Sequence, residues 1–156
     1  MPRQIRPATP APPTPRQRVE AACARQGRDV VITECTRALV GAHDADAGFI
    51  ARLGGGHAAV VLDDDRDDQH YWLRVWAARG LLWACDGQVV AAETIAALRA
   101  GLRDPTWRVR EMCAKVIARH VVGELFAAVT VARDDPVPRV RSAAARAVET
   151  LSRHDA

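Results

Sequence analysis

Residues that could bind an anionic partner recur at fixed spacing along this chain. Relative to Arg74, Arg110 and Arg141, a Trp or Arg stands two residues before each one and a basic residue stands five residues after it. Positions seven residues apart lie on one face of a helix. With the residues near the helix ends, the predicted binding stripe consists of Trp72, Arg79, Trp83, Arg108, Lys115, Arg119, Arg139 and Arg146, followed by Thr150.

Such a stripe fits two kinds of anionic partner. Arg and Trp are typical hot spots of protein interfaces, so an acidic protein segment is one candidate. In a nucleic acid, the arginines would contact phosphates and the tryptophans would stack on unpaired bases. A third interpretation is a solvated polar face that binds nothing, because stacked helical repeats always expose one. No acidic residue shares the stripe with the tryptophans, and a net charge of +3 is low for a dedicated nucleic-acid binder.

Catalysis has little support in the sequence. Ser, Thr, His and Asp form no local nucleophile–base pattern, and His70 and His120 are isolated in the sequence. The glycines Gly54–Gly56 lack the Lys and the Ser or Thr that complete a phosphate-binding loop. We therefore expect a protein that is not an enzyme and that holds no cofactor.

The cysteines indicate a reducing compartment. None of Cys23, Cys35, Cys85 and Cys113 belongs to a CxxC motif, and structural zinc needs paired ligands at short spacing. A metal site that adds His43 or His120 is the alternative, but we expect no metal and a cytoplasmic location. No apolar run approaches 18 residues and no apolar leader is present, so we expect neither a membrane span nor a secretory signal.

The elements that must position the stripe come from an internal repeat. Residues 104–117 recur as residues 135–148, and residues 68–81 are a fainter copy. Each copy has an Asp, an Arg six residues later and an Ala four residues beyond, and the copies start 36 and then 31 residues apart. A repeat of this length predicts stacked helical units. The shared residues are Asp68, Asp104 and Asp135, Arg74, Arg110 and Arg141, and Ala78, Ala114 and Ala145.

Each copy is expected to form a helix that begins at its Asp. The carboxylate would accept unpaired N–H groups of the first turn, and Pro105 and Pro136 suit the first helical position. Partner helices are expected over Val90–Leu102 and Gly123–Arg133. Helical spacing predicts buried stripes of Leu73, Trp76, Ala77, Gly80 and Leu81, then Val109, Met112, Cys113, Val116 and Ile117, and then Val140, Ala143, Ala144, Ala147, Val148 and Leu151.

The repeats resemble HEAT repeats, in particular the short bacterial HEAT-like type. The matching residues are Asp104-Pro105, Val109-Arg110, Ala114 and Ile117, and Asp135-Pro136, Val140-Arg141, Ala145 and Val148. The resemblance implies an all-α, right-handed α–α superhelix of about three repeats. It also implies a structural ladder in which Asp68, Asp104 and Asp135 pair with Arg74, Arg110 and Arg141 across repeat boundaries. Proteins of this type mostly act as scaffolds.

These observations predict a disordered Pro-rich tail over residues 1–15 and one domain over residues 16–156. Two N-terminal helices over residues 16–43 would cap repeats at 44–84, 85–120 and 121–153, with Gly54–Gly56 forming either a kink in a helix or a loop. The expected function is a non-catalytic scaffold or protein-interaction module that binds a protein partner through the basic stripe. The alternative is a HEAT-like protein, related to DNA repair, that binds the nucleic-acid backbone.

Overall fold

The computed structural model describes residues 10–42, 44–63, 69–87 and 91–154. Every regular element within these ranges is a helix, which confirms the all-α prediction for this part of the chain. No helix among them is long and apolar enough to cross a membrane. Most of the predicted tail, residues 1–9, lies outside the described ranges, and so does Asp68.

Nine α-helices and two short 3-10 turns follow one another along the described chain. The turns, Gly123–Leu125 and Ala132–Asp134, flank the eighth helix. The helices are α1 (Pro15–Gln26), α2 (Arg28–Leu39), α3 (Ala47–Gly54), α4 (Ala58–Asp63), α5 (Tyr71–Ala84), α6 (Ala92–Gly101), α7 (Trp107–His120), α8 (Phe126–Val131) and α9 (Pro138–His154).

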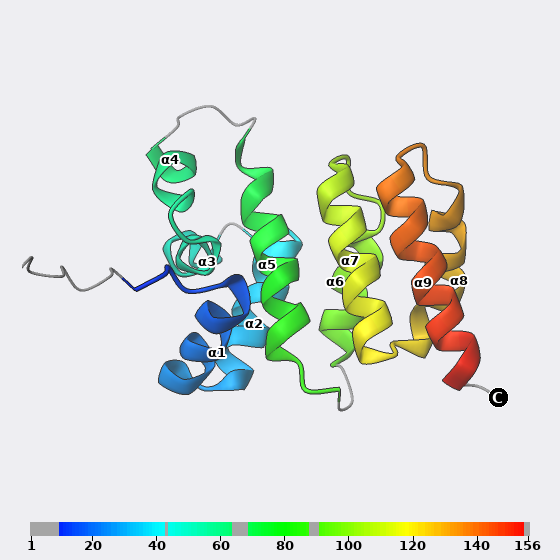
Figure 1. The fold of residues 1–156 in the computed structure, drawn as a ribbon, viewed down its shortest axis with the longest axis horizontal. Coiled ribbons are helices and arrows are strands. Elements are labelled where there is room, and N and C mark those ends of the chain that lie inside the picture. The colour runs from blue at the N-terminus through cyan, green and yellow to red at the C-terminus, as the bar shows by residue number, and fades with distance from the viewer. Residues whose placement is uncertain (1–9, 43, 64–68, 88–90, 155–156) are drawn as a thin grey trace, which may run out of the picture.

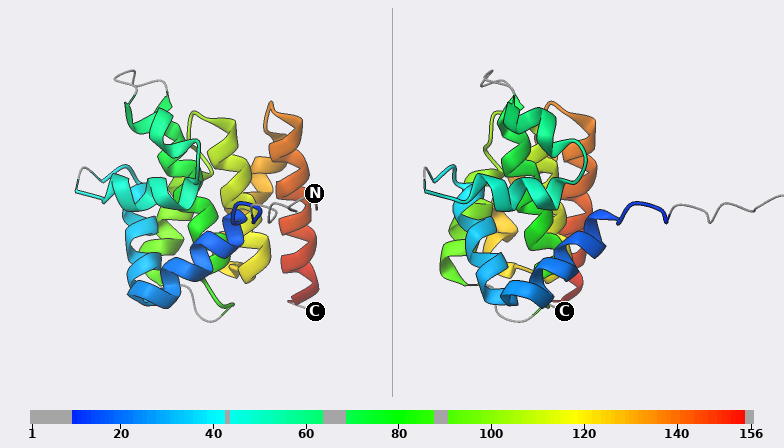
Figure 2. Two further views of the ribbon diagram at one scale, coloured as in Figure 1. Left: turned by 60° about the vertical axis from the view of Figure 1, so that its left-hand side comes forward. Right: turned by 90° about the vertical axis from the view of Figure 1, so that its left-hand side faces the viewer.

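The helices are arranged in two layers (Figure 1). In one layer α5, α7 and α9 lie side by side, and each contacts the next. In the other layer α2 packs on α5 and α6, α6 packs on α7, and α8 packs on α9. The remaining side of α5 is covered by α1 and α3, as the two turned views show (Figure 2). The basic stripe of the repeat helices therefore lies on the α5–α7–α9 layer.

The repeat helices begin later than the sequence predicts. Asp104 and Asp135 are expected at the first turn, but α7 starts at Trp107 and α9 starts at Pro138. Each Oδ1 instead accepts the N–H two residues on, from Thr106 and from Val137, both at 2.8 Å. These side-chain turns hold Pro105 and Pro136 in the loop ahead of the helix. The helices therefore start two residues after the prolines that are predicted to occupy the first helical position.

The main packing partner of α5 comes from the segment predicted to form the N-terminal cap. The prediction assigns residues 44–63 to the first repeat, yet α2 is the helix that packs most extensively on α5. The glycine segment breaks the helix after Gly54: α3 ends at Gly54, and Gly55, with a φ of 82°, begins the turn to α4. Gly54 lies against the Trp76 ring, where an added Cβ would come within 2.5 Å of the indole.

The predicted partner helices are shorter than expected. The first is α6, Ala92–Gly101, and residues 88–90 ahead of it lie outside the described ranges. The expected Gly123–Arg133 helix contains only six α-helical residues in α8, between its two 3-10 turns. Val129, Thr130 and Val131 are β-branched, which weakens a short helix.

Cysteine and glycine side by side allow the two layers to approach closely. The Cys35 thiol of α2 lies over Gly80 of α5, and the Cys113 thiol of α7 lies over Gly101 of α6. A Cβ at either glycine would collide with the sulfur. Both cysteines are fully buried, which confirms the predicted burial of Cys113.

Candidate binding groove

The regular Asp and Arg residues form two rungs between neighbouring repeat helices. Arg74 Nε lies 2.7 Å from Asp104 Oδ2, and its Nη2 lies 3.3 Å from Oδ1. Arg110 repeats this geometry with Asp135, at 2.7 Å and 3.0 Å. Both aspartate side chains are only 8% exposed. Each Asp is thus held by the Arg of the preceding repeat helix, in the two-pronged geometry that makes such pairs strong.

The Arg of the second rung, Arg110, also fastens the loop ahead of its own helix. Arg110 Nη1 donates to the carbonyl oxygens of Asp104, at 2.8 Å, and Pro105, at 3.1 Å. The hydrogen bond from Arg110 lowers the pKa of Asp135 and raises the pKa of Arg110 itself. These side chains are occupied in holding the fold, so they are not available for a partner.

The third Arg is anchored in the same way but lacks a carboxylate among the described residues. Arg141 Nη1 donates to the carbonyl oxygens of Asp135, at 2.8 Å, and Pro136, at 3.1 Å. The guanidinium is exposed. Asp68, the predicted partner in the first rung, lies outside the described ranges.

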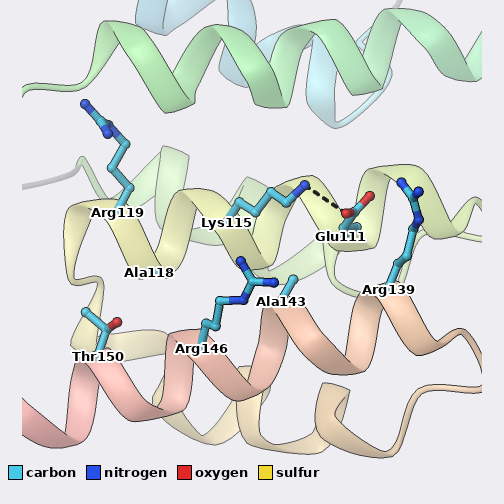
Figure 3. Close-up of a pocket in the computed structure, with 8 residues that line it drawn as sticks. All are labelled: Glu111, Lys115, Ala118, Arg119, Arg139, Ala143, Arg146 and Thr150. Atoms are coloured by element: carbon cyan, nitrogen blue, oxygen red, sulfur yellow. Dashed lines mark hydrogen bonds and ion pairs between the residues drawn. The ribbon is translucent and has the colours of Figure 1, made fainter.

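A groove of about 520 Å³ runs between α7 and α9 (Figure 3). Its basic side chains project from both helices toward the α5 side of the groove, and two alanines lie between them. Five of the lining residues belong to the predicted stripe, if Thr150 at its end is included. The lining residues are Glu111, Lys115, Ala118, Arg119, Arg139, Ala143, Arg146 and Thr150.

The charges in the groove leave three arginines without a carboxylate partner within the described residues. Lys115 Nζ lies 2.8 Å from Glu111 Oε1, so these two charges offset one another. Arg119, Arg139 and Arg146 have no ion pair to a described acidic side chain, and all three are exposed. Their guanidinium groups can form paired hydrogen bonds to a carboxylate or a phosphate.

Two of these arginines, Arg119 and Arg139, contact tryptophan rings, and Arg16 contacts one of the same rings. At the C-terminal end of α7, the Arg119 guanidinium lies 4.6 Å from the centre of the Trp83 ring, and Arg16 of α1 lies 5.4 Å from the same ring. At the other end, Arg139 lies 5.9 Å from Trp107. Such cation–π contacts restrain an arginine while leaving its N–H edge available.

A column of stacked side chains lies next to the groove, at the start of α7. The Arg108 guanidinium lies between Trp107, at 4.5 Å, and Trp72, at 5.4 Å. Trp72 in turn stacks on Tyr71 and Trp76, with ring centres 5.3 Å and 6.0 Å apart. Trp72 is therefore half-buried in an aromatic cluster.

The part of the stripe on α5 is covered by the N-terminal helices. Arg79 is half-buried, and burial, with a smaller effect of Arg18, lowers its pKa. The cover comes from α1, which packs on α5 and is fixed to α3 where Arg18 Nε donates to the Leu53 carbonyl oxygen at 2.9 Å. Neither Arg79 nor Trp72 lines the groove.

The structure thus brings together four of the eight predicted stripe residues: Lys115, Arg119, Arg139 and Arg146. Trp83 is connected to this group only by its cation–π contact with Arg119. Arg108 lies in the column of stacked side chains next to the groove. Sequence reasoning missed Glu111, although an acidic residue four positions before Lys115 on a helix is a recognisable signal. It also missed Ala118, because nothing in the sequence distinguishes an alanine that lines a groove from any other alanine.

The cysteines and other possible metal ligands are the remaining candidates for a chemical site. Within the described residues, no group of three or more His, Cys, Asp and Glu side chains could hold a metal ion, and all four cysteines are free thiols. Burial raises the pKa of Cys85 to about 11 and raises the pKa values of Cys35 and Cys113 further. These thiols are therefore poor nucleophiles near neutral pH.

His120 is a core residue at the end of α7. Its side chain is 7% exposed, and its Nε2 lies 3.1 Å from the carbonyl oxygen of Leu82. Burial lowers its pKa. Its imidazole is therefore part of the α5–α7 contact.

Comparisons with known proteins do not narrow the assignment. No family model matches the sequence, and neither a curated protein nor a solved structure shows significant similarity to it.

Proposed function

We propose that this chain is a short HEAT-like repeat protein whose helices form a right-handed α–α superhelix. The proposal is supported by the recurring Asp and Arg pairs, which join α5 to the α7 loop and α7 to the α9 loop with the same atoms. The two-layer packing of helices is the second support. Such proteins present extended surfaces built from successive repeats.

On this scaffold, the function that the geometry supports best is non-catalytic binding of an acidic segment of a partner protein. The observation that carries the proposal is the convergence of Arg119, Arg139 and Arg146 on one groove without carboxylate partners among the described residues. An acidic segment would supply the missing carboxylates. The four free cysteines also favour a cytoplasmic location.

The groove is suited to side-chain carboxylates for two further reasons. Ala118 and Ala143 are small, so they leave room for the carboxylate of an incoming Asp or Glu. Arg119 and Arg139 are already restrained by Trp83 and Trp107, which reduces the side-chain entropy lost on binding.

The alternative, binding of a nucleic-acid backbone, is favoured only by the net positive charge of the groove. Base stacking requires an uncovered aromatic face. Trp107 and Trp83 each lie between two arginines, and Trp72 stacks on Tyr71 and Trp76 and lies next to Arg108. The tryptophans therefore offer bases little to stack on, and an acidic protein segment is the better fit.

Charge reversal in the groove distinguishes these partners. The test compares wild type with Arg119→Glu/Arg139→Glu/Arg146→Glu, using labelled poly-L-glutamate and single-stranded DNA as probes. The control is Arg25→Glu/Arg103→Glu/Arg133→Glu, which changes the net charge equally at exposed positions that do not line the groove. We expect poly-L-glutamate to bind wild type and the control but not the groove variant. Tighter binding of the DNA, lost in the groove variant, would favour the alternative.

A further inference from the structure

The outer face of α9 is built like faces that are covered in the earlier repeats. Ala78 of α5 and Ala114 of α7 are both 0% exposed. Each lies one turn after the Arg that pairs with the Asp of the next repeat, so each faces that repeat. Ala145 of α9 occupies the same repeat position and is exposed. Arg141, one turn earlier on this face, holds its own loop as Arg110 does but has no carboxylate partner within the described residues. The outer face of α9 therefore carries the same small residue and the same Arg that α5 and α7 use to contact the next repeat.

The same face carries a carboxylate at the matching distance from Ala145. Glu149 lies four residues after Ala145, as Arg141 lies four residues before it, so each charge is about 6 Å from Ala145 along the helix axis. The Glu149 side chain is 68% exposed, and its ion pair with Arg153 is loose, at 3.9 Å. The charge pattern is thus self-complementary when the helix is turned end for end about Ala145.

We propose that this face binds a second copy of the chain, with the two α9 helices antiparallel and crossing at Ala145. Arg141 of each copy then faces Glu149 of the other, giving two equivalent ion pairs around a twofold axis. Ser142, Ala145 and Ser152 are small and exposed, so the helix backbones can approach closely. In the dimer, Glu149 supplies Arg141 with the kind of carboxylate that Asp135 supplies to Arg110.

The expected dimer is weak. One pair of helices buries less surface than the roughly 1,200–2,000 Å² of a stable protein interface. We therefore expect a monomer at micromolar concentration and a reversible dimer as the concentration approaches millimolar. The α9 residues of the basic groove, such as Arg139, Ala143 and Arg146, lie on another side of the helix. Dimer formation and binding in the groove can accordingly succeed or fail independently.

Sedimentation equilibrium of the full chain over this concentration range tests the charge pairing. Arg141→Glu places like charges opposite each other and should weaken association by about tenfold or more. Adding Glu149→Arg restores opposite charges and should recover association to within about threefold of wild type. A wild type that stays monomeric throughout would overturn the proposal, as would a double variant no better than Arg141→Glu.

Cross-linking tests the crossing point and does not depend on the charge variants remaining folded. In a Cys23→Ser/Cys85→Ser background, Ala145→Cys should form a disulfide-linked dimer under mild oxidation, because the two introduced thiols meet at the twofold axis. Ala127→Cys, at an exposed position on α8, is the matched control and should remain monomeric. Equal cross-linking of both variants, or no cross-linking of the Ala145→Cys variant, would contradict this interface.

Discussion

At the scale of single residues, the same type of side chain does different work depending on what surrounds it. Arg110 lies between a buried carboxylate and two carbonyl oxygens, and it holds repeats together. Arg141 has the carbonyl contacts but no described carboxylate. Arg146 has neither contact and lines the groove. These three environments lead to different consequences when the Arg is removed.

Arg110→Ala should destabilise the fold by about 2 kcal/mol, because it leaves the carboxylate of Asp135 buried without a partner. Arg141→Ala is the matched control, since it removes the same two carbonyl contacts without orphaning a described carboxylate, and it should cost less than about 1 kcal/mol. Urea unfolding of both variants measures the difference. Equal losses of stability would show that the ladder pair contributes nothing beyond the loop contacts.

His120 should make the fold less stable in mild acid. Its pKa is lowered in the folded protein by burial, so below about pH 6.5 the unfolded chain binds the proton more readily. Stability is therefore complete above this pH and declines as the pH falls toward the folded-state pKa. His120→Gln should flatten that decline. Parallel declines of the melting temperature from about pH 7.5 to about pH 5.5 in both proteins would contradict the assignment.

At the scale of elements, the sequence identifies the repeat helices and most of their buried stripes. Of the predicted core of α7, four residues are fully buried and Met112 is half-buried. The predicted stripes omit Ala78 and Ala114, although both are fully buried. The apolar spacing within one helix identifies only one of its buried faces. Ala78 and Ala114 lie on another face, which contacts the next repeat.

The boundaries of elements are predicted less well, for local reasons. The side-chain turns at Asp104 and Asp135 delay the start of each helix, since a proline follows at once and stays in the loop. The packing of α2 on α5 joins helices that are separated in the chain by α3 and α4. Long-range pairing of this kind leaves no periodic signal.

The close contact of α6 with α7 depends on Gly101. Gly101→Ala should destabilise the fold by about 1–3 kcal/mol, because the new methyl group meets the buried Cys113 thiol. Removing that sulfur in Gly101→Ala/Cys113→Ala should recover part of the loss. Gly123→Ala, where an added Cβ meets nothing within 4 Å, is the control and should be close to neutral. Thermal unfolding that ranks Gly101→Ala with the control would refute this role.

At the scale of the whole molecule, the packing of the repeat helices brings arginines that are separated in the sequence onto one surface. The sequence predicts that Lys115, Arg119, Arg139 and Arg146 share a stripe, and the α7–α9 contact places them around one groove. It cannot show that α1 and α3 cover the α5 part of that stripe, because packing between separate helices leaves no periodic signal in the sequence. The accessible binding surface is accordingly shorter than the periodicity implies.

The most direct test of the central claim is a titration of labelled poly-L-glutamate against wild type and Arg119→Glu/Arg139→Glu/Arg146→Glu at low ionic strength. We predict saturable binding by wild type that weakens as salt is added and falls by about tenfold or more in the variant. Undiminished binding by the groove variant, or no binding by wild type, would contradict the proposal that this groove recognises acidic protein segments.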